Sequence, residues 1–170
     1  MIDIFLAYDS SDEYWRIRFD DVFGQDFNCR LISPGEMESE TGEDFIRWIL
    51  EQDLLTEDTV MVALIGPKTF ASKKMDWELA AALEKKGRRP TGIVPTRLPN
   101  HDDYQKKSVN PRRIPGRLAD NLKSGYVKIY DWTESPKELE KRIYTALKEA
   151  RSLGMKASNS RKLMARDMFL

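Results

Sequence analysis

The chain alternates between five short apolar runs and amphipathic segments, with one long interruption before the fifth run, and this pattern constrains its fold more than any other feature. We expect strands in the apolar runs and helices in the amphipathic segments. Such an order is typical of a parallel sheet with helices on both faces. The sequence therefore predicts an α/β, flavodoxin-like fold: a doubly wound, five-stranded parallel sheet in three α/β/α layers. The first and third strands are near-continuous apolar runs, which places them at the centre of the sheet.

The expected elements can be assigned to ranges of the sequence. Strands are expected at residues 2–8, 28–32, 59–65, 91–96 and 126–130. Helices are expected around residues 15–23, 45–55, 76–86 and 136–153. Residues 98–123 form a long connection, rich in basic residues and proline, that we expect to lie outside the sheet. The predicted organisation is one domain over residues 1–153, followed by a basic C-terminal tail over residues 154–170.

The composition of the chain excludes several classes of function. The 170 residues carry a formal net charge of +0, which argues against a general nucleic-acid binder. Cys29 is the only cysteine, so an intrachain disulfide is excluded and no metal site is expected. His101 is the only histidine, and we expect it to be a solvated loop residue rather than part of a catalytic triad. No signal peptide or membrane span is visible, so the sequence predicts a cytoplasmic protein without a membrane partner.

Several nucleotide and phosphate chemistries do not fit the loops after the strands. A receiver domain needs a phosphoacceptor aspartate at the end of the third strand, but residues 64–67 read Leu-Ile-Gly-Pro. Asp9 and Asp12, which follow the first strand, are not sufficient alone. The first turn contains no glycine and no Walker motif is present, so the sequence indicates neither a dinucleotide-binding Rossmann site nor a P-loop.

A ligand site is still expected where the parallel strands end, because such sheets bind ligands in the crevice at that edge. The expected lining comprises Tyr8, Asp9 and Ser10, the acidic loop 36–41, Trp77 and Glu78. Glu78 is expected to flank the buried stripe of its helix and to stay partly exposed. The alternative is a helix-N-terminal glutamate stabilised by the macrodipole. Trp77 fits equally a substrate-stacking residue or a core residue.

Three segments carry a resemblance to a known family. They are residues 4–19 (IFLAYDSSDEYWRIRF), residues 58–94, which include LIGPKTFASKKMDWE, and residues 127–132 (VKIYDW). Together they resemble the bacterial TIR-like proteins of the Thoeris antiphage defence system, over about residues 2–150. The resemblance implies a flavodoxin-like TIR domain that cleaves NAD at the nicotinamide–ribose bond. It also implies that the ADP-ribose is cyclised into a signalling nucleotide.

The resemblance also implies roles for particular residues and partners. Glu78 would be the catalytic carboxylate, and Tyr8, Asp9 and Ser10 would contact the substrate, with Trp77 available to stack on one of its rings. NAD would be the substrate, and no cofactor is expected. The nucleotide product would reach a downstream effector protein, and the family allows self-association. These properties are those of an NAD hydrolase or ADP-ribosyl cyclase.

One carboxylate is chemically sufficient for this reaction. Most glycoside hydrolases need a second one to protonate the leaving oxygen. Nicotinamide in NAD is cationic and leaves as a neutral molecule, so an ionised glutamate that stabilises the oxocarbenium-like ribose is enough. Two alternatives remain open: a nucleoside deoxyribosyltransferase-like enzyme, and a non-catalytic TIR-type interaction module. In the latter Glu78 is a surface residue and the basic connection meets an acidic partner.

Overall fold

The computed structural model describes residues 1–33 and 41–168, and its centre is one parallel sheet. The strands are β1 (Ile2–Ala7), β2 (Phe27–Arg30), β3 (Val60–Ile65), β4 (Gly92–Arg97) and β5 (Tyr130–Asp131). Their order across the sheet is β2-β1-β3-β4-β5, and every neighbouring pair is parallel. This is the flavodoxin-like order, so the predicted fold class is confirmed.

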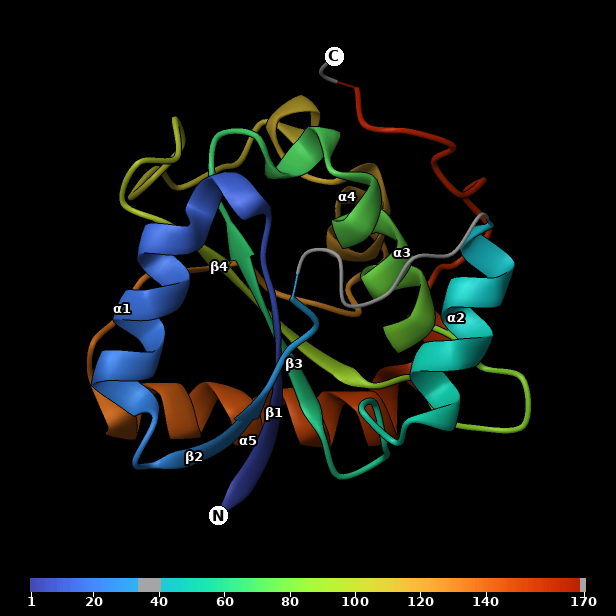
Figure 1. Ribbon diagram of the computed structural model, residues 1–170, viewed down its shortest axis with the longest axis horizontal. Coiled ribbons are helices and arrows are strands. Elements are labelled where there is room, and N and C mark those ends of the chain that lie inside the picture. The colour runs from blue at the N-terminus through green and yellow to red at the C-terminus, as the bar shows by residue number, and fades with distance from the viewer. Residues whose placement is uncertain (34–40, 169–170) are drawn as a thin grey trace.

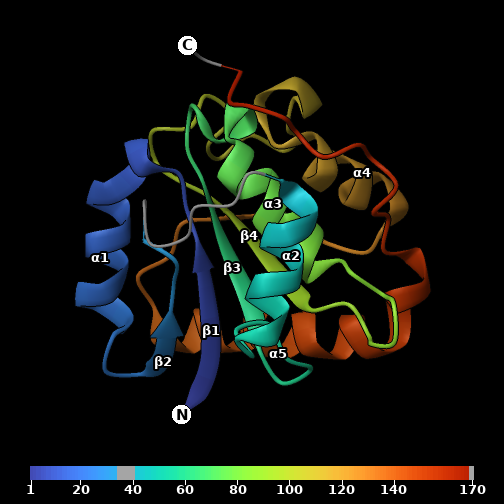
Figure 2. The same cartoon turned by 45° about the vertical axis from the view of Figure 1, so that its right-hand side comes forward.

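Helices cover both faces of the sheet (Figure 1). They are α1 (Glu13–Phe23), α2 (Gly42–Glu51), α3 (Lys73–Ala82), α4 (Gly116–Ser124) and α5 (Pro136–Leu153). Side chains of α1 and α5 pack on one face, and side chains of α2, α3 and α4 pack on the other. The result is the predicted three-layer architecture, seen from a second direction in Figure 2.

The two inner strands explain why the sheet forms where it does. All six residues of β3 are buried, and so are the last four of β1. Ile4 and Val62 have no exposed surface, as expected for strands covered on both faces. Hydroxyl side chains set the helix starts, because Thr41, Ser72 and Ser135 each accept a hydrogen bond from the backbone amide three residues on.

The structure differs from the prediction around the fifth strand. We predicted a strand over residues 126–130, but β5 is only Tyr130–Asp131. The amides of Tyr126 and Val127 instead donate to the backbone carbonyl of Asn121, at the end of α4, over 3.1 and 3.2 Å. The long connection lies outside the sheet, as predicted, but it contains the helix α4, which the sequence analysis did not anticipate.

The C-terminal tail packs on the domain. From residue 157 onward it runs along α3 and α4 and returns to the sheet edge at which the strands end (Figure 2). Asn121 holds Ser158 through two hydrogen bonds of 2.8 Å, one to its backbone amide and one to its carbonyl. At the far end, the amide of Met168 donates to the carbonyl of Ala71 over 3.0 Å. The tail is therefore an outer layer over these two helices.

Candidate functional site

The loop after β1 forms one wall of a small cavity at the carboxyl edge of the sheet. Asp9 accepts hydrogen bonds from the backbone amide of Ser11, over 3.0 Å, and from the Ser11 hydroxyl, which fixes the turn. The cavity has a volume of about 230 Å³. It is lined by Asp9, Ser10, Ser11, Lys68, Ala71, Ser72 and Asp167. Two of the residues expected at the substrate, Asp9 and Ser10, thus lie together at the start of α3.

Glu78 lies one and a half turns into α3 and is completely buried. The expectation of partial exposure was wrong. Its Oε1 atom contacts the Lys74 ammonium, and its Oε2 atom has no hydrogen-bond partner within residues 1–33 and 41–168. Burial raises the pKa of this carboxyl to about 7, against the opposing pull of the Lys74 charge. An acid in this state exchanges its proton near neutral pH.

Lys74 connects Glu78 to the first strand. Its Nζ atom lies 5.0 Å from the centre of the Tyr8 ring, so one ammonium contacts both the carboxylate and the aromatic face. Tyr8 is buried at the end of β1, and burial together with the nearby Glu13 charge raises its pKa. The structure therefore brings Tyr8 and Glu78 together through a residue that the sequence analysis did not select. Its signal was the four-residue spacing between Lys74 and Glu78 on one helix face.

A second acid is buried close to the same edge. The Asp12 carboxylate packs against the backbone of Gly66, where an added Cβ would lie 2.3 Å from its oxygens. Thr69 donates its hydroxyl to Asp12 over 3.2 Å and accepts the Gly66 amide over 2.8 Å. Burial raises the pKa of Asp12 to about 6. The sequence did not indicate a role for Asp12, but in the structure its carboxylate holds the loop after β3 against the loop after β1.

Trp77 is not brought together with the other expected site residues. Its indole N–H donates to the carbonyl of Met164 in the tail over 2.8 Å, and its ring lies 5.7 Å from that of Phe45. Only 6% of the residue is exposed. Of the two interpretations offered by the sequence, this environment matches the core residue. The acidic loop that was expected to complete the crevice falls mostly at residues 34–40, outside the described residues.

The single histidine also differs from expectation. His101 is buried, not solvated. Its Nδ1 accepts the amide of Asp103 over 3.0 Å, and its Nε2 lies 2.9 Å from the carbonyl of Arg113. Both ring nitrogens are therefore used within the connection between β4 and α4. A structural role of this kind leaves no imidazole nitrogen for catalysis.

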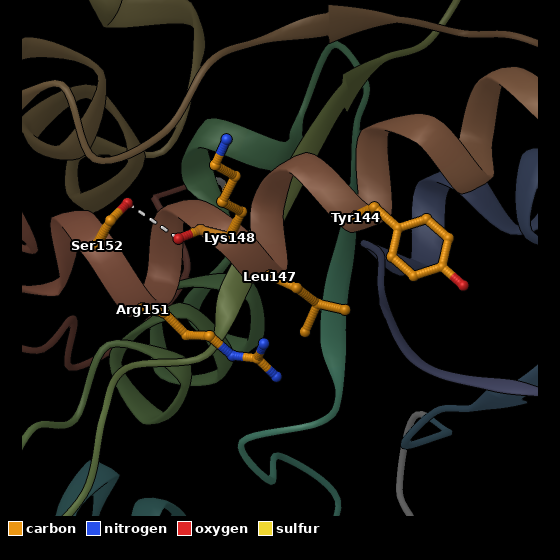
Figure 3. Close-up of a pocket in the computed structure, with 5 residues that line it drawn as sticks. All are labelled: Tyr144, Leu147, Lys148, Arg151 and Ser152. Carbon is orange, nitrogen blue, oxygen red and sulfur yellow. Dashed lines mark hydrogen bonds between the residues drawn. The ribbon is translucent and has the colours of Figure 1, made fainter.

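The outer face of α5 carries a separate groove of about 430 Å³ (Figure 3). All five of its lining residues come from that one helix: Tyr144, Leu147, Lys148, Arg151 and Ser152. It holds no carboxylate, and we assign it no chemistry. No cluster of three metal-ligating side chains occurs in the part of the chain that the structure describes. Among the same residues, no helix combines the length and apolar character that crossing a bilayer requires.

Comparison with known proteins places the chain in a family. Residues 4–114 match the TIR domain model, and this match covers most of the sheet, α3 and the carboxyl-edge loops. The protein belongs to the TIR domain family. No curated protein matches the chain. One similar solved structure is the signal receiver domain of a Luxo repressor protein from Vibrio parahaemolyticus. It is 14% identical over 93% of this chain and 99% of that chain, with a TM-score of 0.46.

Proposed function

We propose that this TIR domain cleaves NAD at the nicotinamide–ribose bond, with Glu78 as the catalytic carboxylate. The observation that carries the proposal is the state of Glu78. A fully buried carboxylate oxygen without a partner among the described residues is costly to the fold. Perturbed acids at a sheet edge are typical of functional sites. The TIR family, which includes NAD-cleaving enzymes as well as interaction modules, supplies the substrate class.

The proposed step needs only the ionised form of Glu78. Nicotinamide leaves as a neutral base, taking the electrons of the glycosidic bond, and the ribose develops oxocarbenium character. Water, which then loses a proton, or a nucleophilic group of the same ADP-ribose forms the new bond to that ribose carbon, which gives the open or the cyclic product. A carboxylate in a site that excludes water stabilises that charge more strongly than it would in solution. With a pKa of about 7, roughly half of the Glu78 population is ionised at neutral pH. This share already includes the effect of the Lys74 ammonium, which favours the charged carboxylate.

Substrate entry requires Lys74 to move. Glu78 has no exposed surface, while about a quarter of the Lys74 side chain is exposed, between the carboxylate and solvent. Lys74 has several rotatable bonds, so we expect a rotamer change of this side chain to expose Glu78 without moving the backbone of α3. Tyr8, Asp9 and Ser10 then flank the ribose, as the resemblance implies. We further propose that the ADP-ribose is cyclised into a signal for a downstream effector in a Thoeris-type antiphage response.

A second candidate function is a TIR interaction module without catalysis. The surface position that this interpretation gave Glu78 was wrong, since the residue is completely buried. The same burial nevertheless separates the carboxylate from any substrate in this arrangement, and this is the observation that favours a non-catalytic module. A nucleoside deoxyribosyltransferase-like reaction is the third candidate and differs in substrate. All three can be separated by one assay.

The test is incubation with NAD, or with a deoxynucleoside and a free base, in the presence and absence of extract from phage-infected cells. Nicotinamide release and a cyclic ADP-ribose product, both absent from Glu78→Gln, are the expected results. Base exchange without nicotinamide release identifies the transferase. The interaction module is identified if the protein releases no nicotinamide, with or without extract, and self-associates in a concentration-dependent way.

A further inference from the structure

A larger cavity, of about 900 Å³, lies on the other side of α3 from Glu78. It is enclosed by the turn Pro111–Arg113, the start of α4 and the C-terminal tail. Its apolar lining comes from Phe70, Pro111, Ile114, Ala119, Met164 and Met168. This volume lies within the range of pockets that take ligands of drug or nucleotide size.

The charged lining of this cavity is predominantly basic. Arg112, Lys123 and Lys162 line it, and none of the three forms an ion pair with a carboxylate of the described residues. Arg161 also lines it, held in a two-pronged contact of 2.8 Å to each oxygen of Asp120. The remaining acid, Asp76, is neutralised by the buried Arg117. The cavity therefore has an excess of positive charge and no free carboxylate among the described residues.

The neighbouring basic residues show that this excess is not simply a property of the basic connection. Arg113 pairs with Asp103 at 3.1 Å, and Lys106 pairs with the same carboxylate at 3.5 Å. Arg112 differs from them because it lines a cavity and forms no ion pair with an acid within residues 1–33 and 41–168. Lys107 is exposed and is not part of the cavity lining, which makes it a matched reference for charge effects.

The first turn of α4 adds to the positive potential. Pro115 precedes this nine-residue helix and provides no side-chain cap for the amides of its first turn. Gly116, the first helical residue, lines the cavity with no side chain in the way. The guanidinium of Arg161 lies across Gly116, where an added Cβ would be 2.7 Å from it. An anion at this point would meet both a helix N-terminus and fixed cations.

We propose that the cavity between α4 and the C-terminal tail binds a small phosphorylated ligand with a planar apolar body, of the nucleotide class. The phosphates pair with Arg112, Lys123 and Lys162, which form no direct ion pair with a carboxylate of the described residues, although the Lys123 charge helps to lower the pKa of the nearby Asp120. The planar body packs on the methionine and phenylalanine wall, as aromatic groups do on polarisable sulfur. The site is separate from Glu78 and does not depend on NAD cleavage.

The test uses ADP, inorganic pyrophosphate and adenosine as probes. Titration into ¹⁵N-labelled protein should shift the amides of Gly116 and Ala119 with ADP, and calorimetry should give ADP a lower Kd than pyrophosphate or adenosine. Arg112→Glu and Lys123→Glu should each weaken ADP binding about tenfold or more, because each removes a charge-assisted contact and adds repulsion. Lys107→Glu, with the same charge change outside the cavity, should leave the Kd unchanged.

Three outcomes would overturn the proposal. ADP could shift only the amides of residues 9–11, which would place it at the carboxyl-edge cavity. Adenosine or pyrophosphate could bind as tightly as ADP, so that either the cations or the apolar wall contributes nothing. Lys107→Glu could weaken binding as much as Arg112→Glu, which would show non-specific attraction. All substituted side chains are exposed, so circular dichroism should report an unchanged fold in every variant.

Discussion

Asp76 and Glu78 are two buried carboxylates on the same helix, and they have opposite surroundings. Asp76 receives the guanidinium of Arg117 at 3.0 and 3.4 Å and the backbone amide of Met164 at 2.8 Å. Glu78 has one partner, Lys74, and one oxygen with none among the described residues. Two positions along a helix rotate a side chain by about 200°, which is why neighbours in sequence meet different environments.

The difference separates a structural acid from a candidate catalytic one. The Asp76–Arg117 pair also binds the C-terminal tail, because Arg117 donates a hydrogen bond to Asn159 over 2.9 Å. Every donor around Asp76 is therefore committed to holding the protein together. Glu78 retains an acceptor that the described fold does not use, and burial holds its pKa near neutrality. A buried carboxylate with hydrogen-bond donors on both oxygens helps to hold the fold together. A buried carboxylate with one oxygen that lacks a donor is available for chemistry.

The largest expected effect is a loss of stability when Asp76 is replaced. Asp76→Asn leaves Arg117 buried without its counter-ion, and breaking a buried pair in this way costs about 3–5 kcal/mol. Urea unfolding should show this loss, and trypsin should cleave the released tail faster. Asp120→Asn is the control, because its pair with Arg161 is partly exposed and is expected to contribute below about 1 kcal/mol. If both variants lose the same free energy of unfolding, the buried Asp76–Arg117 pair is no more important to stability than the partly exposed Asp120–Arg161 pair.

The next effect is the pH dependence of stability caused by Glu78. Its pKa is about 7 when folded and near 4.5 when unfolded, so the folded state retains the proton between these values. The stability linked to this proton is fully present below about pH 4.5 and is lost as pH rises through about 7. Glu78→Gln does not titrate, so its free energy of unfolding relative to wild type should rise by on the order of 1–3 kcal/mol over that range.

Urea unfolding at pH 5 and pH 8 measures this change. Asp12, whose pKa is also raised, is present in both proteins and cancels in the difference. A gap between the two proteins that stays constant with pH would show that Glu78 is not perturbed by burial.

A smaller effect is expected from Lys74. Lys74→Met removes the cation that lowers the pKa of Glu78, so that pKa should rise further above its ordinary value. Since the ionised form is the active one, the acid limb of the pH profile of kcat/KM should move to higher pH by about one unit. Lys73→Met is the matched control, because its ammonium lies 4.6 Å over the Trp77 ring and not at Glu78. If the acid limb does not move, the ionisation of Glu78 does not control kcat/KM.

The smallest effect concerns Trp77, which lies between the two acids in the sequence and packs on the tail beside Asp76. Trp77→Phe removes the hydrogen bond to Met164 and should cost about 1 kcal/mol of stability. The KM for NAD should not change. A several-fold rise in KM with little loss of stability would instead support the substrate-stacking role, which remains a prediction from the sequence.

Much of the fold followed from the sequence, because local signals were consistent with one another. The continuous apolar runs at β1 and β3 fixed the centre of the sheet, and Ser135 with Pro136 marked the start of α5. The predicted fifth strand was too long because the amides of Tyr126 and Val127 donate to the Asn121 carbonyl instead of to a neighbouring strand. Asn121 belongs to α4, a helix that the basic, proline-containing sequence of the connection did not indicate. Tail docking depends on Arg117 and Asp76, which are 41 residues apart and give no local pattern.

The candidate site was only partly predictable. Strand order places the loop after β1 beside the start of α3, so the association of Asp9 and Ser10 with that helix could be expected. The burial of Glu78 could not, because every residue from Met75 to Ala82 is buried. Periodicity assumes one exposed face, whereas α3 is enclosed by the sheet, α2, α4 and the tail.

Nicotinamide release by wild type, Glu78→Gln and Asp76→Asn tests the central distinction most directly. The rates are measured with activating extract at a temperature at which all three proteins are folded, and are expressed per folded molecule. We expect a loss on the order of 10²-fold or more for Glu78→Gln, since one preorganised charge is removed. For Asp76→Asn we expect a rate near that of the wild type. A folded Glu78→Gln protein that releases nicotinamide at the wild-type rate would contradict the assignment of Glu78 as the catalytic carboxylate.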